Sequence, residues 1–214
     1  MGTIKIGILG GFSGKVGTVI GATWKGIDYM RSRATSVSNP NTPAQLEHRA
    51  KFVTIVLFLK PLTAFLRFGF KSLAIKKSGF NAAMAANFKN DVIIGTYPAF
   101  NIDYTKISVS QGNLPGALNP ATVSATAGTV RFTWENNSWE TNASVDDQAV
   151  LVVYNPTKEA AVSVIGGLTR AVGSQTIILP NSFSGDEVQC YIAFTNANQS
   201  VISNSQYVMG LIVI

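Results

Sequence analysis

Hydrophobic and polar positions follow one pattern near the start of the chain and another further on. Between residues 14 and 35, glycines are interspersed with single large apolar side chains. These are Val16, Val19, Ile20, Trp24, Ile27, Tyr29 and Met30. The pattern predicts short β-strands separated by turns, with one turn at Lys25-Gly26. Glycine at this density also allows another backbone to approach closely.

A helix is predicted next. Asn41 or Thr42 can cap its start, and Pro43 suits its first turn. No helix breaker occurs from Gln45 to Phe58. After Lys51 the helix is apolar on nearly all sides, so we expect it to be buried on most of them.

The helical region continues beyond this point. Pro61 should kink or restart the helix, residues 62–70 extend it, and an alanine-rich helix is expected at about residues 81–87. A region with so little polar helix surface is completed most simply by a second copy of itself. The alternative is that the glycine-rich strands cover the helix within one chain.

From Leu114 onward the pattern changes to short runs rich in Val, Ile, Thr, Phe and Tyr. The runs are ATVSAT, GTVRFTW, AVLVVY, AVSVI, QTIILP, VQCYIAF and QYVMGLIVI. Their spacing of roughly 8–12 residues predicts an antiparallel sandwich of the immunoglobulin or fibronectin type. Trp134 would be its core tryptophan and Tyr191 its corner tyrosine. The expected fold class is therefore α+β, with glycine-rich strands and apolar helices preceding the sandwich.

Two domains are predicted from these patterns. Residues 1–112 would form a basic domain of β-hairpin and helices, and residues 113–214 the sandwich. The junction is expected at Asn113 to Pro120, whose sequence is NLPGALNP. Residues 92–110 fit either side of it.

Composition adds one constraint. Apolar residues make up 46% of the 214 residues and charged residues only 13%, against a usual charged share of about 25%. Such a composition suggests that something other than water covers part of the surface. No membrane span is expected, because the apolar run from Phe52 to Leu59 stops at Lys60-Pro61, well short of the roughly 20 residues that a span needs.

The start of the chain lacks the pattern of a signal peptide. We therefore expect a protein that is cytoplasmic as synthesised, and its later incorporation into an extracellular or virion-like assembly is compatible with that expectation.

The net charge of +6 is unevenly distributed. Residues 1–106 hold 14 basic and 4 acidic residues, a net charge of +10, whereas residues 107–214 hold 3 and 7, a net charge of −4. Opposite charge on the two parts would favour head-to-tail contact between copies.

The glycine-rich stretch GGFSGKVG, residues 10–17, invites comparison with phosphate-binding loops. A nucleotide-hydrolase loop needs glycine five residues before Gly14 and a serine or threonine after Lys15, but Leu9 and Val16 occupy these positions. The glycine spacing also differs from the dinucleotide fingerprint and leads into a strand pattern rather than a helix. Tight turns and close packing explain these glycines better.

Other signs of catalysis are weak. His48 is the one histidine and has no nucleophile signature near it, so we expect it to be structural or solvated. Cys190 lies in an apolar run and should be a buried small hydrophobe. Asp146 and Asp147, with Glu140, form an acidic cluster that we interpret as a solvated loop, with a weak calcium site as the second choice. No catalytic residue, metal, cofactor or small-molecule substrate is expected.

Three stretches carry a family resemblance: Gly14-Lys15-Val16-Gly17, Trp24-Lys25-Gly26, and Asn39-Pro40 with Thr42 and Gln45. With the later FTW, VYNP and YIAF, they resemble an uncharacterised bacterial domain-of-unknown-function family of about this length. The resemblance covers nearly the whole chain. It implies no activity, cofactor or site residue.

These observations predict a non-enzymatic structural protein that self-associates into a filament, ring or shell, of a phage-like or surface-associated kind. The uncharged C-terminal strand VMGLIVI would complete its own sheet or add to a neighbour's edge. The expected assembly contacts are Trp24, Phe52, Phe58, Phe65 and Phe68.

Two alternatives stay open. The first is a nucleic-acid-binding protein whose basic half contacts phosphates through Arg31, Arg33, Arg49, Lys76 and Lys77. Long cationic side chains that keep an apolar helix soluble explain part of the same pattern. The second is carbohydrate or cell-surface binding by the sandwich through Trp134 and Trp139, although Trp134 is expected in the core.

Overall fold

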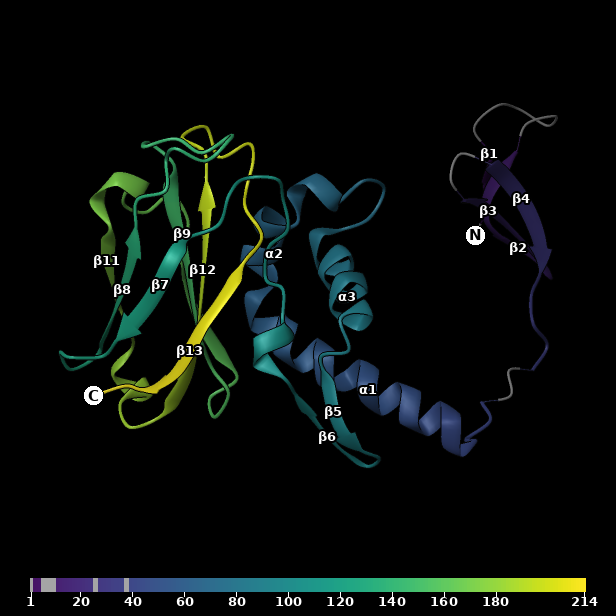
Figure 1. Cartoon of the computed structure of the whole chain (residues 1–214). Coiled ribbons are helices and arrows are strands. Elements are labelled where there is room, and N and C mark those ends of the chain that lie inside the picture. The colour runs from purple at the N-terminus through teal and green to yellow at the C-terminus, as the bar shows by residue number, and fades with distance from the viewer. Residues whose placement is uncertain (1, 5–10, 25–26, 37–38) are drawn as a thin grey trace. The chain divides into compact units, whose positions relative to one another are not determined.

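The computed structural model describes residues 2–4, 11–24, 27–36 and 39–214. The chain divides into two compact units, residues 1–42 and residues 43–214. We call them the N-terminal unit and the main unit and describe each by itself (Figure 1). The expected turn at Lys25-Gly26 lies outside the described residues.

The N-terminal unit is a small antiparallel sheet with the strand order β1-β2-β3-β4. Its strands are β1 (Thr3–Ile4), β2 (Phe12–Val16), β3 (Val19–Trp24) and β4 (Ile27–Ser32). Gly14 and Gly17 have φ values of 102° and 57°, and a β-carbon on Gly21 would lie 2.1 Å from the carbonyl oxygen of Phe12. Glycine is needed at these three positions for positive φ or close approach, which confirms the interpretation for Gly14, Gly17 and Gly21, whereas Gly10 lies outside the described residues.

The main unit begins with three helices. They are α1 (Pro43–Leu59), α2 (Thr63–Gly69) and α3 (Gly79–Lys89), with short 3-10 turns at η1 (Lys60–Leu62) and η2 (Lys71–Leu73). The expected interruption at Pro61 is confirmed, because η1 separates α1 from α2 at this residue. The side chain of Ser78 caps α3 by accepting a hydrogen bond of 3.1 Å from the N–H of Asn81.

A two-stranded hairpin and a seven-stranded sandwich follow. The hairpin pairs β5 (Ile93–Thr96) with β6 (Ala99–Ile102). The sandwich strands are β7 (Leu118–Val123), β8 (Thr129–Glu135), β9 (Gln148–Asn155), β10 (Ala160–Val164), β11 (Ser174–Ile178), β12 (Glu187–Thr195) and β13 (Gln206–Ile212). They form one sheet with the order β10-β9-β12-β13 and another with the order β11-β8-β7. The fold is therefore α+β with a sandwich half, as predicted.

Strands β9 and β12 are buried on both faces. In β9, Leu151 and Val153 pack in the core between the two sheets, whereas Val150 and Val152 pack in a second core against the helices. Side chains alternate between the faces of a strand, so a strand covered on both sides must be apolar throughout. The unbroken runs AVLVVY and VQCYIAF reflect this position in the middle of three layers.

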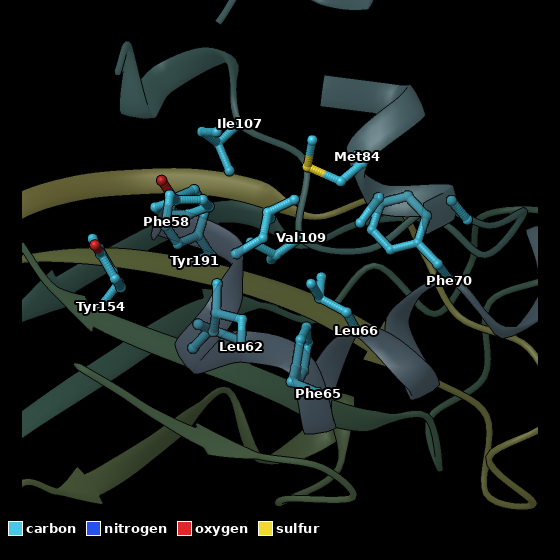
Figure 2. Packing of buried hydrophobic residues seen from close by; sticks show 14 of the residues in the cluster. Phe58, Leu62, Phe65, Leu66, Phe70, Met84, Ile107, Val109, Tyr154 and Tyr191 are labelled. Atoms are coloured by element: carbon cyan, nitrogen blue, oxygen red, sulfur yellow. The ribbon is translucent and has the colours of Figure 1, made fainter. Parts of the chain in front are cut away.

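Figure 2 shows the core on the helical side, where Phe58, Leu62 and Leu66 from the helices meet Tyr154 and Tyr191 from the sheet. Tyr154 lies on β9 beside Val150 and Val152, and Tyr191 lies on β12 beside Ala193, all in this core. Packing of the helices on the sheet thus joins the first and second halves of the main unit.

The domain boundary expected between residues 112 and 113 does not coincide with this division. Ile107 and Val109 lie in the same core as the helices and strands β9 and β12. Asn87 of α3 is fully buried and holds this segment in place: its side-chain amide donates to the carbonyl oxygen of Ser108 and accepts from the N–H of the same residue, at 2.9 and 2.8 Å. The helices and the sandwich belong to one unit because they share a core.

Of the two landmark aromatic residues, Trp134 is buried between the sheets as predicted. Tyr191 faces the opposite way, toward the helices, and its hydroxyl donates to the carbonyl oxygen of Tyr104 at 3.0 Å. The comparison with a corner tyrosine is therefore wrong, because that hydroxyl bonds to the connection between β6 and β7 rather than to a corner of the sandwich.

Candidate assembly surface

Helix α1 is buried along one side only. Ile55, Phe58 and Leu59 are buried in the core. On the other side Phe52, Val53 and Leu57 are 49%, 52% and 43% exposed. The helix was expected to be buried on most sides, and within the main unit it is not, because α3, the β5–β6 hairpin and the sheet leave one side of it uncovered.

A groove runs beside the exposed side of α1. It has a volume of about 420 Å³ and is lined by His48, Phe52, Phe80, Asn81, Met84, Ala85 and Phe88. The ring of His48 stacks on that of Phe88 with 5.8 Å between centroids, and Phe52 lies 6.3 Å from the same ring. We call the groove, together with Val53 and Leu57, the α1/α3 face.

One basic residue near the α1/α3 face is neutralised locally. Lys51 forms an ion pair of 2.7 Å with Glu47, one helical turn earlier. The ammonium group of Lys51 also lies 5.3 Å from the ring centre of Phe100 on β6. This pair adds little net charge to the border of the apolar surface, and an apolar centre with a polar border is typical of contacts between proteins.

The five predicted assembly residues occupy three different environments. Phe58 and Phe65 are 1% and 3% exposed and belong to the core, so they contact another copy only if the core opens. Phe68 is partly buried against the same core. Phe52 and Trp24 are exposed, the first on the α1/α3 face and the second on the N-terminal sheet.

The sequence contains a pattern from which the burial of Phe58 and Phe65 could have been predicted. Ile55, Phe58, Leu59, Leu62, Phe65 and Leu66 recur with spacings of three and four residues, which is the stripe of a helix that packs on one side. Additional apolar residues on the other side of α1 obscure this stripe.

The predicted nucleic-acid contacts are exposed but do not belong to one unit. Arg31 and Arg33 lie in the N-terminal unit, whereas Arg49, Lys76 and Lys77 lie in the main unit. Arg49 is on α1, and the two lysines precede α3.

A buried ion pair in the sandwich has no counterpart in the sequence interpretation. The carboxylate of Asp147 lies 3.3 Å from the guanidinium of Arg170, and both side chains are almost fully buried. Arg170 also donates to the carbonyl oxygens of Pro115 and Gly116 at 3.0 and 2.9 Å and to the side chain of Asn137. Burial lowers the pKa of Arg170, and the charge of Asp147 opposes this shift.

The interpretation of Asp147 as part of a solvated loop is therefore wrong, although Asp146 and Glu140 are exposed as expected. Asp147 compensates the buried charge of Arg170, and Arg170 ties the junction segment to the sandwich. The sequence does not predict this pairing, because residues 147 and 170 are far apart along the chain and meet only when the strands between them fold.

Cys190 is buried as predicted, and burial raises the pKa of its thiol to about 12. Among the residues that the structure describes, no group of three or more His, Cys, Asp or Glu side chains is placed to hold a metal ion.

By length and composition, one helical stretch in the described residues is compatible with a membrane crossing. It is Pro43–Gly69, with a mean hydropathy of 1.6 in its most apolar window, 39% of which is buried. The core helix of a soluble protein meets the same criteria, so the expected absence of a span and the cytoplasmic synthesis stay predictions.

Residues 11–209 match DUF6266, a family of unknown function. The chain belongs to this family. None of the curated proteins compared with the chain matches it. Among solved structures, one similar chain is the solution structure of the fn3 domain of human collagen alpha-1(XX) chain. It has 15% identity and a TM-score of 0.34, over 47% of this chain and 87% of that chain.

Proposed function

We propose that this DUF6266 protein is a non-enzymatic structural protein that self-associates, and that the α1/α3 face is its contact surface. The observation that supports the proposal is the exposure of Phe52, Val53 and Leu57 beside an apolar groove. An open groove lined mostly by apolar and aromatic side chains is typical of contact sites on proteins. The occupant we propose is a second copy of the chain.

A second apolar surface supports contact between copies. The N-terminal sheet exposes Val16, Val19 and Met30 on one side. Two different apolar surfaces on one chain are what a head-to-tail contact requires, since each copy can offer one surface and receive the other. Contacts of this kind produce rings when they close and filaments when they do not.

The test is the mass of the purified, nuclease-treated protein by light scattering, with negative-stain microscopy, at roughly 0.1 M and 1 M salt. Apolar contacts persist at high salt, whereas phosphate-mediated association weakens steeply. We expect particles that are larger than the 22.8 kDa monomer and survive in both conditions.

A matched pair of variants assigns the contact to the α1/α3 face. Val53→Asp places a charge on the face and should reduce the particles to monomers. Leu168→Asp makes the same type of change at a position of similar exposure on the sandwich, 48% against 52%, and should leave assembly intact. A monomer in both salt conditions, or equal behaviour of the two variants, contradicts the proposal.

A further inference from the structure

The two faces of the N-terminal sheet differ in chemistry. Pairing aligns Lys15 with Ile20, Ile20 with Arg31, Ala22 with Tyr29, and Trp24 with Ile27. Paired residues point to the same side of a sheet, and side chains alternate along each strand. One face therefore carries Lys15, Ile20, Ala22, Trp24, Ile27, Tyr29 and Arg31, and we call it the aromatic–basic face. Strands β2, β3 and β4 are seen in Figure 1.

The aromatic side chains of this face are accessible. Trp24 is 62% exposed and Tyr29 is 44% exposed. Together with Ile27 they border an open depression of about 480 Å³. Large aromatic rings on an open sheet face offer flat apolar surfaces for a ligand that also has flat apolar surfaces.

The charged side chains of this face are all basic. Lys15 and Arg31 lie on it, and Arg33 follows β4, where its N–H donates to the carbonyl oxygen of Thr18 at 2.7 Å and continues the strand pairing. Asp28 is the one acidic residue among the first 42 positions, and its pairing with Thr23 places it on the opposite face. The aromatic–basic face is thus complementary to an anion.

The spacing of these groups suits a chain of stacked units. Trp24 and Tyr29 are diagonal neighbours on adjacent strands, about 7–8 Å apart by sheet geometry. Arg31 lies two residues beyond Tyr29 on the same face, about 7 Å further along β4. An unstacked base can therefore meet each ring, while the cation lies beside the backbone that joins the bases.

We propose that the aromatic–basic face binds single-stranded nucleic acid. Trp24 and Tyr29 stack on bases, and Lys15, Arg31 and Arg33 contact phosphates. Single strands fit better than duplexes because the bases of a duplex stack on one another and do not offer their flat surfaces to a protein. The proposal is independent of the α1/α3 face, since its residues all lie in the N-terminal unit.

The experiment titrates the nuclease-treated full chain with 12-nucleotide oligodeoxythymidine, oligouridine and a DNA duplex of equal length. Trp134 is buried and Trp139 is exposed, so the reference protein carries Trp139→Phe, which leaves Trp24 as its exposed tryptophan. We expect both single strands to quench its fluorescence and the duplex to bind more weakly. The oligodeoxythymidine and oligouridine arms show whether DNA or RNA is preferred.

Variants locate the binding site. Trp24→Ala and Tyr29→Ala should each weaken single-strand binding roughly 5- to 150-fold, measured by anisotropy of a labelled oligonucleotide. Trp24→Phe keeps a stacking ring and should retain most of the affinity. Arg31→Gln should reduce the slope of log affinity against log salt by about 0.7. Ser32→Ala is the matched control, because Ser32 is exposed between Arg31 and Arg33 in sequence but points to the opposite face.

Several results overturn the proposal. One is the absence of single-strand binding at about 0.1 M salt, and another is equal binding by the Ser32→Ala, Tyr29→Ala and Trp24→Ala proteins. A third is a change of particle mass in Trp24→Ala without a change in oligonucleotide affinity, which makes this face a protein contact. Monomers that still bind oligonucleotide would contradict self-association and leave the present proposal standing.

Discussion

The two units of this chain bury their apolar side chains to different extents. The main unit has two cores that share the strands β9 and β12. In the N-terminal unit, the sheet residues are exposed or half-buried, with Gly21 as the buried exception among those described. Glycine has no side chain to bury, so this sheet lacks the apolar packing that usually stabilises a small fold.

This difference teaches where stability and binding are expected to lie. Strands β9 and β12 are buried on both faces and couple the helices to the sandwich. A destabilising substitution in one core should therefore lower the stability of the other core as well. We expect a sheet with exposed aromatic and apolar residues to be stabilised by the molecules that bind to it. Stability should therefore map to residues 43–214, and recognition to the exposed surfaces.

The largest expected effect tests the coupling within the main unit. Phe58→Ala removes a ring from the helical core and should lower the free energy of unfolding by about 4 kcal/mol. Unfolding followed through the fluorescence of Trp134, which lies in the other core, should report this loss. Leu73→Ala, at an exposed apolar residue of η2, is the control and should cost under about 1 kcal/mol.

A normal Trp134 transition in Phe58→Ala would contradict the coupling. It would restore the two-domain division at residue 112, in which the helices unfold independently of the sandwich.

A somewhat smaller effect is expected at the buried ion pair. Asp147→Asn preserves shape but leaves the charge of Arg170 uncompensated, and should cost about 3 kcal/mol in urea denaturation. Asp146→Asn, its exposed neighbour, should be close to neutral. If the two variants have equal stability, Asp147 does not compensate Arg170 in the folded protein.

Alkaline pH should weaken the main unit specifically. Burial raises the pKa of Tyr191 well above its ordinary value of 10.0 and that of Cys190 from 9.0 to about 12. Because the folded pKa of each group is raised, its stabilising contribution is complete below the unfolded value and is lost as pH rises toward the folded value. For Cys190 the window runs from pH 9.0 to about 12, with about 1.4 kcal/mol lost by pH 10.

The measurement is the free energy of unfolding at pH 8, 9 and 10, with Cys190→Ala as the matched variant. The slope between pH 9 and 10 should be shallower in the variant. Identical slopes would show that the Cys190 thiol ionises equally in the folded and unfolded states.

The smallest expected effect concerns the N-terminal unit. Deletion of residues 1–42 should change the free energy of unfolding of the remaining chain by less than about 0.5 kcal/mol, because both cores consist of residues from the main unit. The same deletion should abolish single-strand binding by the aromatic–basic face. A loss of more than about 1 kcal/mol in the Trp134 transition would mean that the units stabilise each other.

Local patterns identified the elements well. The helix start near Pro43, its interruption at Pro61 and the strand runs after Leu114 are all present. These features depend on neighbours in sequence: proline cannot continue a helix, and alternating or β-branched runs favour strands. The burial of Cys190 and Trp134 also followed from the apolar runs around them.

The candidate site was predicted less completely. Phe52 and Phe58 look equivalent in sequence, yet one is exposed and the other is in the core. On a helix that is apolar all round, hydrophobicity alone does not say which side meets the sheet. The pairing of Asp147 with Arg170 was also invisible, because it depends on strands that are distant in sequence.

The sequence by itself determined the α+β class, the positions of most helices and strands, and the family to which the chain belongs. Tertiary structure alone decided that the helices and the sandwich form one unit, which phenylalanines are buried, and that Trp24, Tyr29 and Arg31 share one face. The physical reason is that secondary structure follows from local backbone preferences, whereas burial and shared faces depend on packing and strand register between segments far apart in the chain.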